Sequence, residues 1–170
     1  MHPLVKLAKD TVELYVREGK ILEVNEEKLP SELRQRAGVF VCLKIKGNLR
    51  GCIGTFHPME PTIAHETVRN AISAASCDPR FECVHADELD SIGYTVDVLT
   101  PPEKVASKNA LDPRRYGVIV QAGGRRGLLL PDLEGVDTVD YQVSIAMQKA
   151  GITPGTAVEL FRFEVKRYEQ

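Results

Sequence analysis

Mostly apolar residues recur every three to four positions in the first segment of the chain. They are Leu4, Leu7, Ala8, Thr11, Leu14 and Tyr15. This spacing puts them on one face of an α-helix, because 3.6 residues complete a turn. Pro3 suits a first helical turn, and Gly19 suits the position after a helix end. The pattern therefore predicts an amphipathic helix over residues 3–18.

A two-residue alternation begins at residue 39. One side of the alternation contains Val39, Val41, Leu43 and Ile45, and the other contains Phe40, Cys42 and Lys44. Alternation of this kind predicts a strand with one deeply buried face. The dipeptide Gly47-Asn48 suits a two-residue II′ turn, so we expect residues 49–56 to return antiparallel as the second arm of a hairpin.

The remaining elements follow from the same two periods and from the positions of proline and glycine. We expect a helix from near Pro61 to before Asp78, a strand over 92–99, strands over 116–121 and 127–130, a helix from 137 or 138 to 151, and a final strand over 157–168. Residues 103–115 are expected to be mostly connection. Helices interspersed with hairpins favour an α+β fold with a mostly antiparallel or mixed sheet and flanking helices, and a doubly wound fold is the alternative.

Chain length and charge limit the number of domains and the classes of partner that we expect. The 170 residues suit a single domain, with room for a small lobe. Twenty-two Lys and Arg against twenty-four Asp and Glu leave a formal charge of −2, so no overall field attracts nucleic acid or an acidic membrane. We therefore expect neither as a partner.

The chain also lacks signals for export. No apolar run approaches the ~20 residues of a membrane helix, and Met1-His2-Pro3 is not a basic region followed by an apolar segment. We expect a cytoplasmic protein. Its four cysteines contain no Cys-x-x-Cys pair, so we expect reduced thiols rather than disulfides.

The hexapeptide Leu49–Gly54 concentrates the candidate chemistry. It reads Leu-Arg-Gly-Cys-Ile-Gly. A thiol reacts as the thiolate, and a nearby cation lowers its pKa, so Cys52 is a candidate nucleophile if a bulge brings Arg50 close to it. His57 and His65 are the candidate bases. Gly51 and Gly54 leave one face of the strand bare, which suits the approach of a ligand, so we predict them as substrate contacts together with Arg50. The structural alternative is that Cys52 is a small core residue and that Gly51 and Gly54 serve packing.

A second motif, the Asp78–Phe81 turn, offers a candidate anion contact. Arg80 suits a bidentate contact with an anionic substrate, and the structural alternative is that Asp78 caps the turn and pairs with Arg80. Histidines and cysteines are scattered without the spacing of a zinc site, and we predict no metal and no cofactor.

These motifs together resemble an AMMECR-type domain. The residues that carry the resemblance are the hexapeptide Leu49–Gly54, then Asp78–Phe81, then Gly-Leu-Leu-Leu-Pro at 127–131, in an order and spacing that match across nearly the whole chain. The segment Gly-Arg-Arg-Gly-Leu-Leu-Leu-Pro, followed by a helix, is similar to the bacterial branch called AmmeMemoRadiSam system protein A.

The resemblance implies an α+β fold with a larger part and a smaller lobe, and a cleft near the two motifs. It implies no assigned reaction. It does imply a functional link to a Memo-type protein and a radical S-adenosylmethionine protein. Two hypotheses follow: an enzyme with Cys52 as nucleophile or contact to a small-molecule substrate, held by Arg50 and Arg80, or a binding module that acts beside those two proteins.

Overall fold

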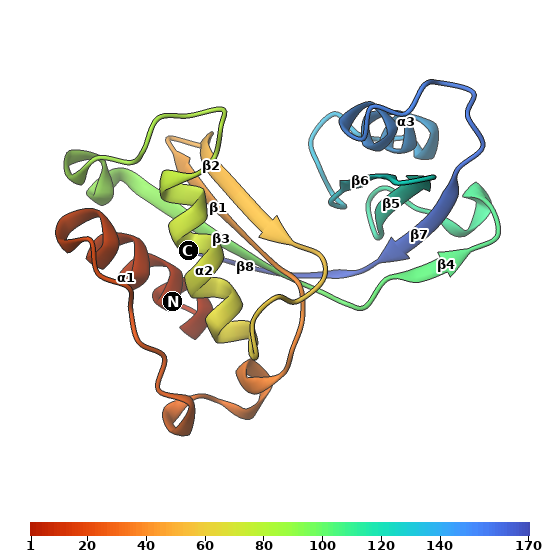
Figure 1. The fold of residues 1–170 in the computed structure, drawn as a ribbon. Coiled ribbons are helices and arrows are strands. Elements are labelled where there is room, and N and C mark those ends of the chain that lie inside the picture. The colour runs from red at the N-terminus through yellow and green to blue at the C-terminus, as the bar shows by residue number, and fades with distance from the viewer. The chain divides into compact units, whose positions relative to one another are not determined.

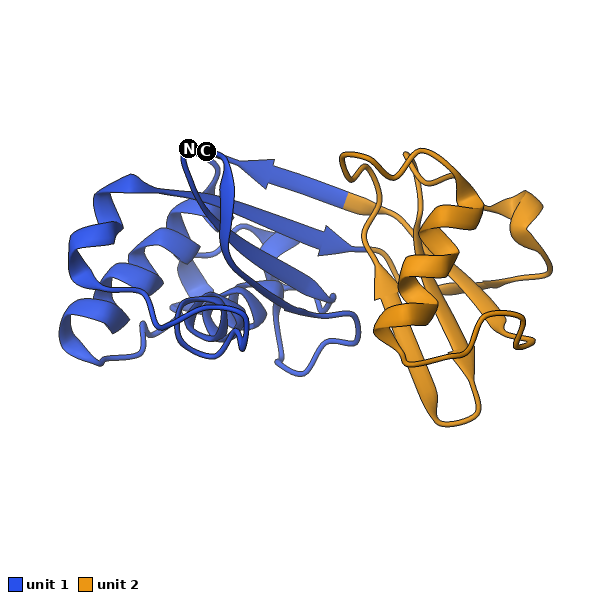
Figure 2. Ribbon diagram, turned by 90° about the horizontal axis from the view of Figure 1, so that it is seen from above, with its two compact units in different colours: residues 1–99, 166–170 blue, residues 100–165 orange.

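Two four-stranded sheets, one packed against two α-helices and the other against one, organise residues 1–170, which the computed structural model describes in full (Figure 1). The strand orders are β2-β1-β3-β8 and β4-β7-β5-β6. The sheets belong to two compact units, unit 1 with residues 1–99 and 166–170 and unit 2 with residues 100–165 (Figure 2). This architecture confirms the predicted α+β class and the expectation of a larger and a smaller part.

Unit 1 contains most of the regular structure. Its elements are α1 (Pro3–Glu18), β1 (Val39–Ile45), β2 (Asn48–Thr55), α2 (Ile63–Ser76), β3 (Ile92–Leu99) and the edge strand β8 (Val165–Glu169), with short 3₁₀ helices at Glu26–Lys28, Ser31–Arg34 and Ala86–Ser91. The predicted helix over residues 3–18 and strand over 39–45 are confirmed. Gly19 caps α1 in the left-handed region, with φ of 68°.

The core of unit 1 lies between one face of the sheet and both helices (Figure 1). The inward side chains of β1, at positions 39, 41 and 43, are fully buried, as the alternation predicts. They pack with Leu4, Val5, Ala8 and Val12 of α1 and with Ala71 and Ala74 of α2. Because burial of apolar area is the main favourable term in folding, this interface fixes the strands that carry the hexapeptide.

The hairpin between β1 and β2 turns one residue earlier than predicted. Ile45 pairs with Asn48, so the two loop residues are Lys46 and Gly47 rather than Gly47 and Asn48. Both have positive φ, 51° and 80°, which is the type I′ arrangement rather than II′. Type I′ turns match the right-handed twist of the flanking strands, and the sequence dipeptide concealed this because lysine rarely takes positive φ.

Unit 2 packs one helix on its sheet. Its elements are β4 (Glu103–Val105), a 3₁₀ helix (Lys108–Ala110), β5 (Gly117–Ala122), β6 (Arg125–Leu129), α3 (Val139–Lys149) and β7 (Glu159–Phe163). Strands β5 and β6 form the predicted hairpin, and α3 is the predicted helix after residue 138. The core contains Val118, Val120, Leu129, Val143 and Ala146. Strand β4 lies within the stretch that was expected to be mostly connection.

The predicted final strand over 157–168 is wrong as a single element. It is two strands, β7 and β8, which belong to different sheets. Glu164 separates them, and its backbone N–H donates to Thr100 Oγ1 at 2.8 Å. Alternation alone cannot reveal this break, because the same period continues through both strands.

Candidate functional site

Strand β2 carries the hexapeptide at the edge of the unit 1 sheet. Gly51 faces α2, and a Cβ added there would lie 2.2 Å from the carbonyl oxygen of Ala74. Gly54 lies on the opposite face, where a Cβ would lie 2.1 Å from the ring of Phe40. Both glycines therefore permit close contacts that any side chain would prevent.

A β-bulge re-aims Arg50. Leu43 pairs with Gly51 and Lys44 pairs with Leu49, so Arg50 is the extra residue in β2. Its guanidinium donates to both carboxylate oxygens of Glu88, at 2.7 and 2.9 Å. Arg50 was relevant to Cys52 only if local twist or a bulge at Gly51 brought their side chains together, and the observed bulge, at Arg50, directs this side chain to Glu88 instead.

Arg50 also holds the backbone of a distant segment. It donates to the carbonyl oxygens of Glu82 and Cys83, at 2.9 and 3.2 Å. The hydrogen bond from Arg50 holds the pKa of Glu88 below its ordinary value, so this carboxylate stays charged. The side chain of Arg50 is only 16% exposed. Arg50 therefore fastens residues 82–88 to β2.

Asp78, in the Asp78–Phe81 turn, likewise fastens its own segment to β2. Its buried carboxylate accepts hydrogen bonds from the backbone N–H of Cys52 at 2.9 Å and from that of Arg80 at 3.1 Å. It also accepts from Arg80 Nε and Nη2, at 3.0 and 2.7 Å. The hydrogen bond from the Arg80 side chain is the main cause that holds the pKa of Asp78 far below its usual range.

The Asp78–Arg80 pair covers the free edge of the sheet at Cys52. The carboxylate of Asp78 takes the outward N–H of Cys52, and Arg80 Nη2 donates to the Cys52 carbonyl at 3.3 Å. Unpaired edge groups invite pairing with other chains, and proteins commonly cover them. Of the two interpretations of this turn, the structure supports the pairing of Asp78 with Arg80.

The side chain of Cys52 forms a disulfide with Cys42. The two residues are direct partners in the β1–β2 register, and their Cα atoms are 4.1 Å apart, as expected for a pair without mutual backbone hydrogen bonds. The prediction of four reduced thiols is therefore wrong for these two, because it took no account of cross-strand register. Cys77 and Cys83 are free and exposed.

The two histidines proposed as bases lie apart from Cys52. Cys52 and the end of β2 at Thr55 are separated by about 10 Å of extended chain, and His57 lies beyond that end, beside Phe56. His65 is on α2, which covers the Gly51 face, whereas Cys52 faces the opposite side. The structure thus gathers the two motifs around Cys52 but places neither His57 nor His65 with them.

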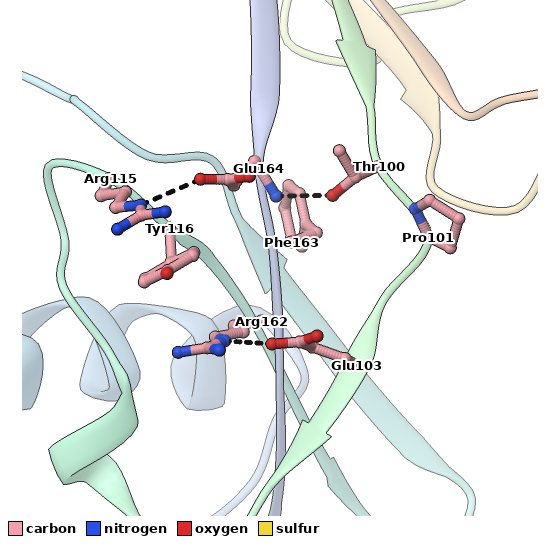
Figure 3. Close-up of a pocket in the computed structure, with 8 residues that line it drawn as sticks. All are labelled: Thr100, Pro101, Glu103, Arg115, Tyr116, Arg162, Phe163 and Glu164. Carbon is pink, nitrogen blue, oxygen red and sulfur yellow. Dashed lines mark hydrogen bonds and ion pairs between the residues drawn. The ribbon is translucent and has the colours of Figure 1, made fainter.

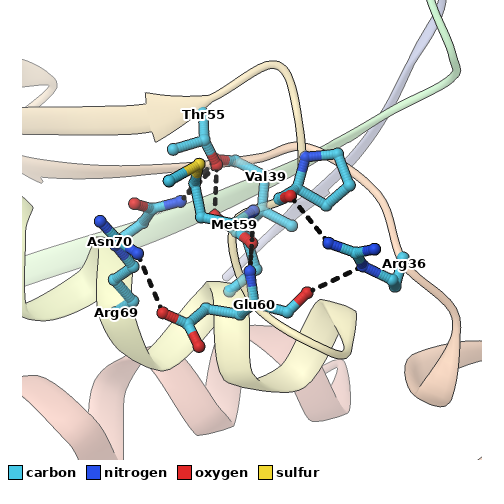
Figure 4. Close-up of polar contacts among 9 residues, drawn as sticks. Arg36, Val39, Thr55, Met59, Glu60, Arg69 and Asn70 are labelled. Carbon is cyan, nitrogen blue, oxygen red and sulfur yellow. Dashed lines mark hydrogen bonds and ion pairs between the residues drawn. The ribbon is translucent and has the colours of Figure 1, made fainter.

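A buried carboxylate that the sequence did not single out organises the loop after β2. Glu66 on α2 is fully buried, and its oxygens accept from Thr55 Oγ1 and from the backbone N–H of Met59 at 2.8 Å and of Glu60 at 2.7 Å (Figure 4). Asn70, one turn later, donates to the carbonyl of Val39 at 2.9 Å. The sequence signal that could have revealed Glu66 and Asn70 is that two polar residues, four positions apart, lie on the buried side of an amphipathic helix.

Two arginines complete the attachment of this loop (Figure 4). Arg36 donates to the carbonyls of Pro58 and Glu60, at 3.1 and 3.2 Å, and Arg69 pairs with the Glu60 carboxylate at 3.0 Å. The side chain of Met59 is nevertheless 60% exposed. The loop over residues 56–60 therefore has a fixed backbone that presents an apolar side chain to solvent.

No group of three or more His, Cys, Asp or Glu side chains lies where it could hold a metal ion. None of the helices has the length and apolar character that crossing a membrane requires.

Comparison with known sequences gives matches along the whole chain. A family model described as AMMECR1 matches residues 5–170. A protein of Thermotoga maritima is 55% identical over 171 residues, which cover 99% of this chain and 98% of that protein. A protein of Clostridium acetobutylicum is 46% identical over 169 residues, which cover 99% of this chain but 36% of the longer Clostridium protein.

A solved structure shares the fold. The crystal structure of an uncharacterized protein from Pyrococcus horikoshii matches with a TM-score of 0.90 and 33% sequence identity. The match covers 98% of this chain and 89% of the Pyrococcus chain. The two-sheet arrangement is therefore common to both proteins.

Proposed function

Because the chain belongs to the AMMECR1 family, we propose that it is a binding module that acts with a Memo-type protein and a radical S-adenosylmethionine protein. The side chains that suggested catalysis are engaged within the chain. Arg50 binds Glu88 and two carbonyls, Asp78 and Arg80 bind each other and the Cys52 backbone, and Cys52 is bonded to Cys42. A cysteine enzyme needs a free thiolate and a base.

The length of the Clostridium relative is the observation that carries this proposal. Nearly all of the present chain aligns with 36% of that protein, so there the domain is joined covalently to a larger remainder. Joining two polypeptides raises the effective concentration of each for the other, which favours pairs that bind. The domain therefore fits a role beside another polypeptide.

We place the contact at the loop over residues 56–60. Its backbone is held by Glu66 and Arg36, so little conformational entropy remains to be lost on binding. Its exposed Met59 is flexible and polarizable, and methionine is common at surfaces that bind proteins. The expected occupant is an apolar recess on the partner protein.

The test is binding of the whole chain to each purified partner, measured by calorimetry. Met59→Glu should weaken binding at least about tenfold, because it puts a charge in an apolar contact. Tyr141→Glu is the matched control, since Tyr141 is a similarly exposed large side chain in unit 2, 52% against 60%. Absence of binding to either partner, or equal loss in both variants, would contradict the proposal.

A second comparison separates binding from catalysis. Arg36→Ala should weaken partner binding because it releases the backbone of the loop over residues 56–60, whereas Cys52→Ser should leave affinity near normal. The reverse ranking would favour the alternative hypothesis, in which a reduced Cys52 reacts with a small-molecule substrate. That alternative also requires Cys52 to be alkylated readily in the native protein after mild reduction.

A further inference from the structure

Unit 2 contains a cavity that none of the preceding hypotheses uses. It has a volume of about 240 Å³ and lies among β4, β7 and the segment that precedes β5 (Figure 3). Its walls are mainly polar, and two arginines and two glutamates line it. Since liquid water occupies about 30 Å³ per molecule, the space suits a ligand of roughly ten non-hydrogen atoms or fewer.

The centre of the cavity wall is a stack of one ring and two guanidinium groups. The guanidinium carbon of Arg162 lies 4.4 Å from the centre of the Tyr116 ring, and that of Arg115 lies 4.8 Å from it. Figure 3 shows Tyr116 between the two arginines. Cations over an aromatic face are attracted by its quadrupole, so the ring holds both groups at the cavity.

Each guanidinium group is also held along one edge. Arg115 Nε donates to Glu164 Oε1 at 2.9 Å, and Arg162 Nε donates to a carboxylate oxygen of Glu103. Arg162 Nη1 donates further to the Ala110 carbonyl at 2.8 Å. The backbone N–H of Glu164 is bonded to Thr100, which fixes the residue that orients Arg115.

The other edges of both groups have donors left over. A guanidinium group carries five N–H donors and no acceptor. Neither terminal nitrogen of Arg115 donates a hydrogen bond within the chain, and Arg162 Nη2 donates none. In Arg115, the carboxylate on the Nε edge leaves the terminal fork free to meet a second pair of oxygens. Three terminal nitrogens at this wall, two of Arg115 and one of Arg162, therefore donate no hydrogen bond within the chain.

We propose that this cavity binds a small oxyanion, a carboxylate or a phosphate, through the free N–H groups of Arg115 and Arg162. Its oxygens accept from the terminal nitrogens that make no hydrogen bond within the chain, and the planar terminal fork of Arg115 can bind two carboxylate or phosphate oxygens at once. Glu103 and Glu164 balance the charges of the two arginines. Affinity therefore rests on directed hydrogen bonds rather than on net charge, and it should fall only gradually with added salt.

The experiment titrates the whole chain with inorganic phosphate and, separately, with malonate, followed by NMR chemical shifts. We expect saturable shifts in residues 100–116 and 162–164 with a Kd of about 1 mM for one probe. The probe that binds more tightly identifies the ligand as phosphate or carboxylate. Arg115→Gln should weaken binding about tenfold, and because the side chain of Arg115 is 65% exposed, this variant should fold.

Arg114→Gln is the matched control. Arg114 is the neighbouring arginine, 73% exposed, and it pairs with Asp137 rather than lining this cavity. We expect it to leave the Kd within about twofold. No saturation by either probe up to about 20 mM, or equal loss in both variants, would overturn the proposal. Neither result depends on partner binding through unit 1.

Discussion

Replacing Gly51 by alanine tests whether the hexapeptide is built for close packing. The new Cβ would lie 2.2 Å from the carbonyl oxygen of Ala74, where ordinary contact begins near 3.4 Å. The clash is with backbone, so no side-chain rotation relieves it. Helix α2 and strand β2 must separate by about 1 Å.

That separation opens the interface between α2 and the sheet. Ala71, Ala74 and Ala75 are at most 2% exposed there, and dispersion attraction falls steeply when such contacts loosen. Overpacking costs about 1–3 kcal/mol, and we expect about 3 kcal/mol because a 14-residue helix moves as a body. At a urea dependence near 2 kcal/mol per molar, the midpoint should fall by about 1.5 M.

Gly93→Ala is the control in the same sheet. A Cβ at position 93 would meet nothing nearer than the Lys44 carbonyl oxygen at 3.8 Å, which is an ordinary contact. We expect its unfolding midpoint, measured by circular dichroism, to stay within about 0.5 M of the parent, because an alanine without strain changes stability by less than about 1 kcal/mol. Equal midpoints for the two variants would refute the packing role of Gly51.

Three further outcomes follow from the polar groups of unit 1. Asp78 has a lowered pKa in the folded state, so it stabilises the fold above the ordinary aspartate pKa near 4, and this stabilisation is lost as the pH falls from there toward the folded-state pKa. Asp78→Asn should therefore flatten the acid side of a plot of unfolding free energy against pH. Tyr94→Phe should raise the free energy of unfolding by about 1 kcal/mol, measured in urea, because the buried Tyr94 hydroxyl has no hydrogen-bond partner. Without reductant, iodoacetamide should modify Cys77 and Cys83 alone, as counted by mass spectrometry, and modification of all four cysteines would contradict the disulfide.

The spacing of apolar residues predicted those helices and strands that bury one continuous side against the core. Helix α1 and strand β1 begin and end where the apolar pattern does, because each buries one continuous side against the core. The break at Glu164 escaped prediction because β7 and β8 have the same period and differ only in the sheet that they join. Sheet membership is a tertiary property that alternation does not encode.

The candidate site required register as well as period. The disulfide follows from the pairing of Cys42 with Cys52, and that pairing follows from where the turn lies together with the one extra residue in β2. The direction of Arg50 follows from one extra residue in β2. The period of one strand reveals neither its register with the neighbouring strand nor a bulge. The sequence therefore predicted that the hexapeptide lies in the second arm of the hairpin, but it did not predict which residues its side chains contact.

In unit 2, as in unit 1, a strand glycine lets a helix pack closely on the sheet. A Cβ at Gly127 of β6 would lie 1.9 Å from the Ala146 carbonyl oxygen of α3, which parallels Gly51 of β2 and Ala74 of α2. In both units a glycine in a strand and an alanine in a helix bring two backbones together. A glycine within a strand pattern is thus explained by the helix that covers it, before any ligand is invoked.

A specific motif need not be a catalytic one. Asp78 accepts the outward N–H of Cys52 at the edge strand β2, and Arg50, the extra residue of the bulge, donates to the backbone carbonyl of Glu82. Side chains committed to such bonds have little capacity left for a ligand. Met59 on its fixed loop and the terminal nitrogens of Arg115 and Arg162 are among the groups that remain uncommitted, and function should be sought there.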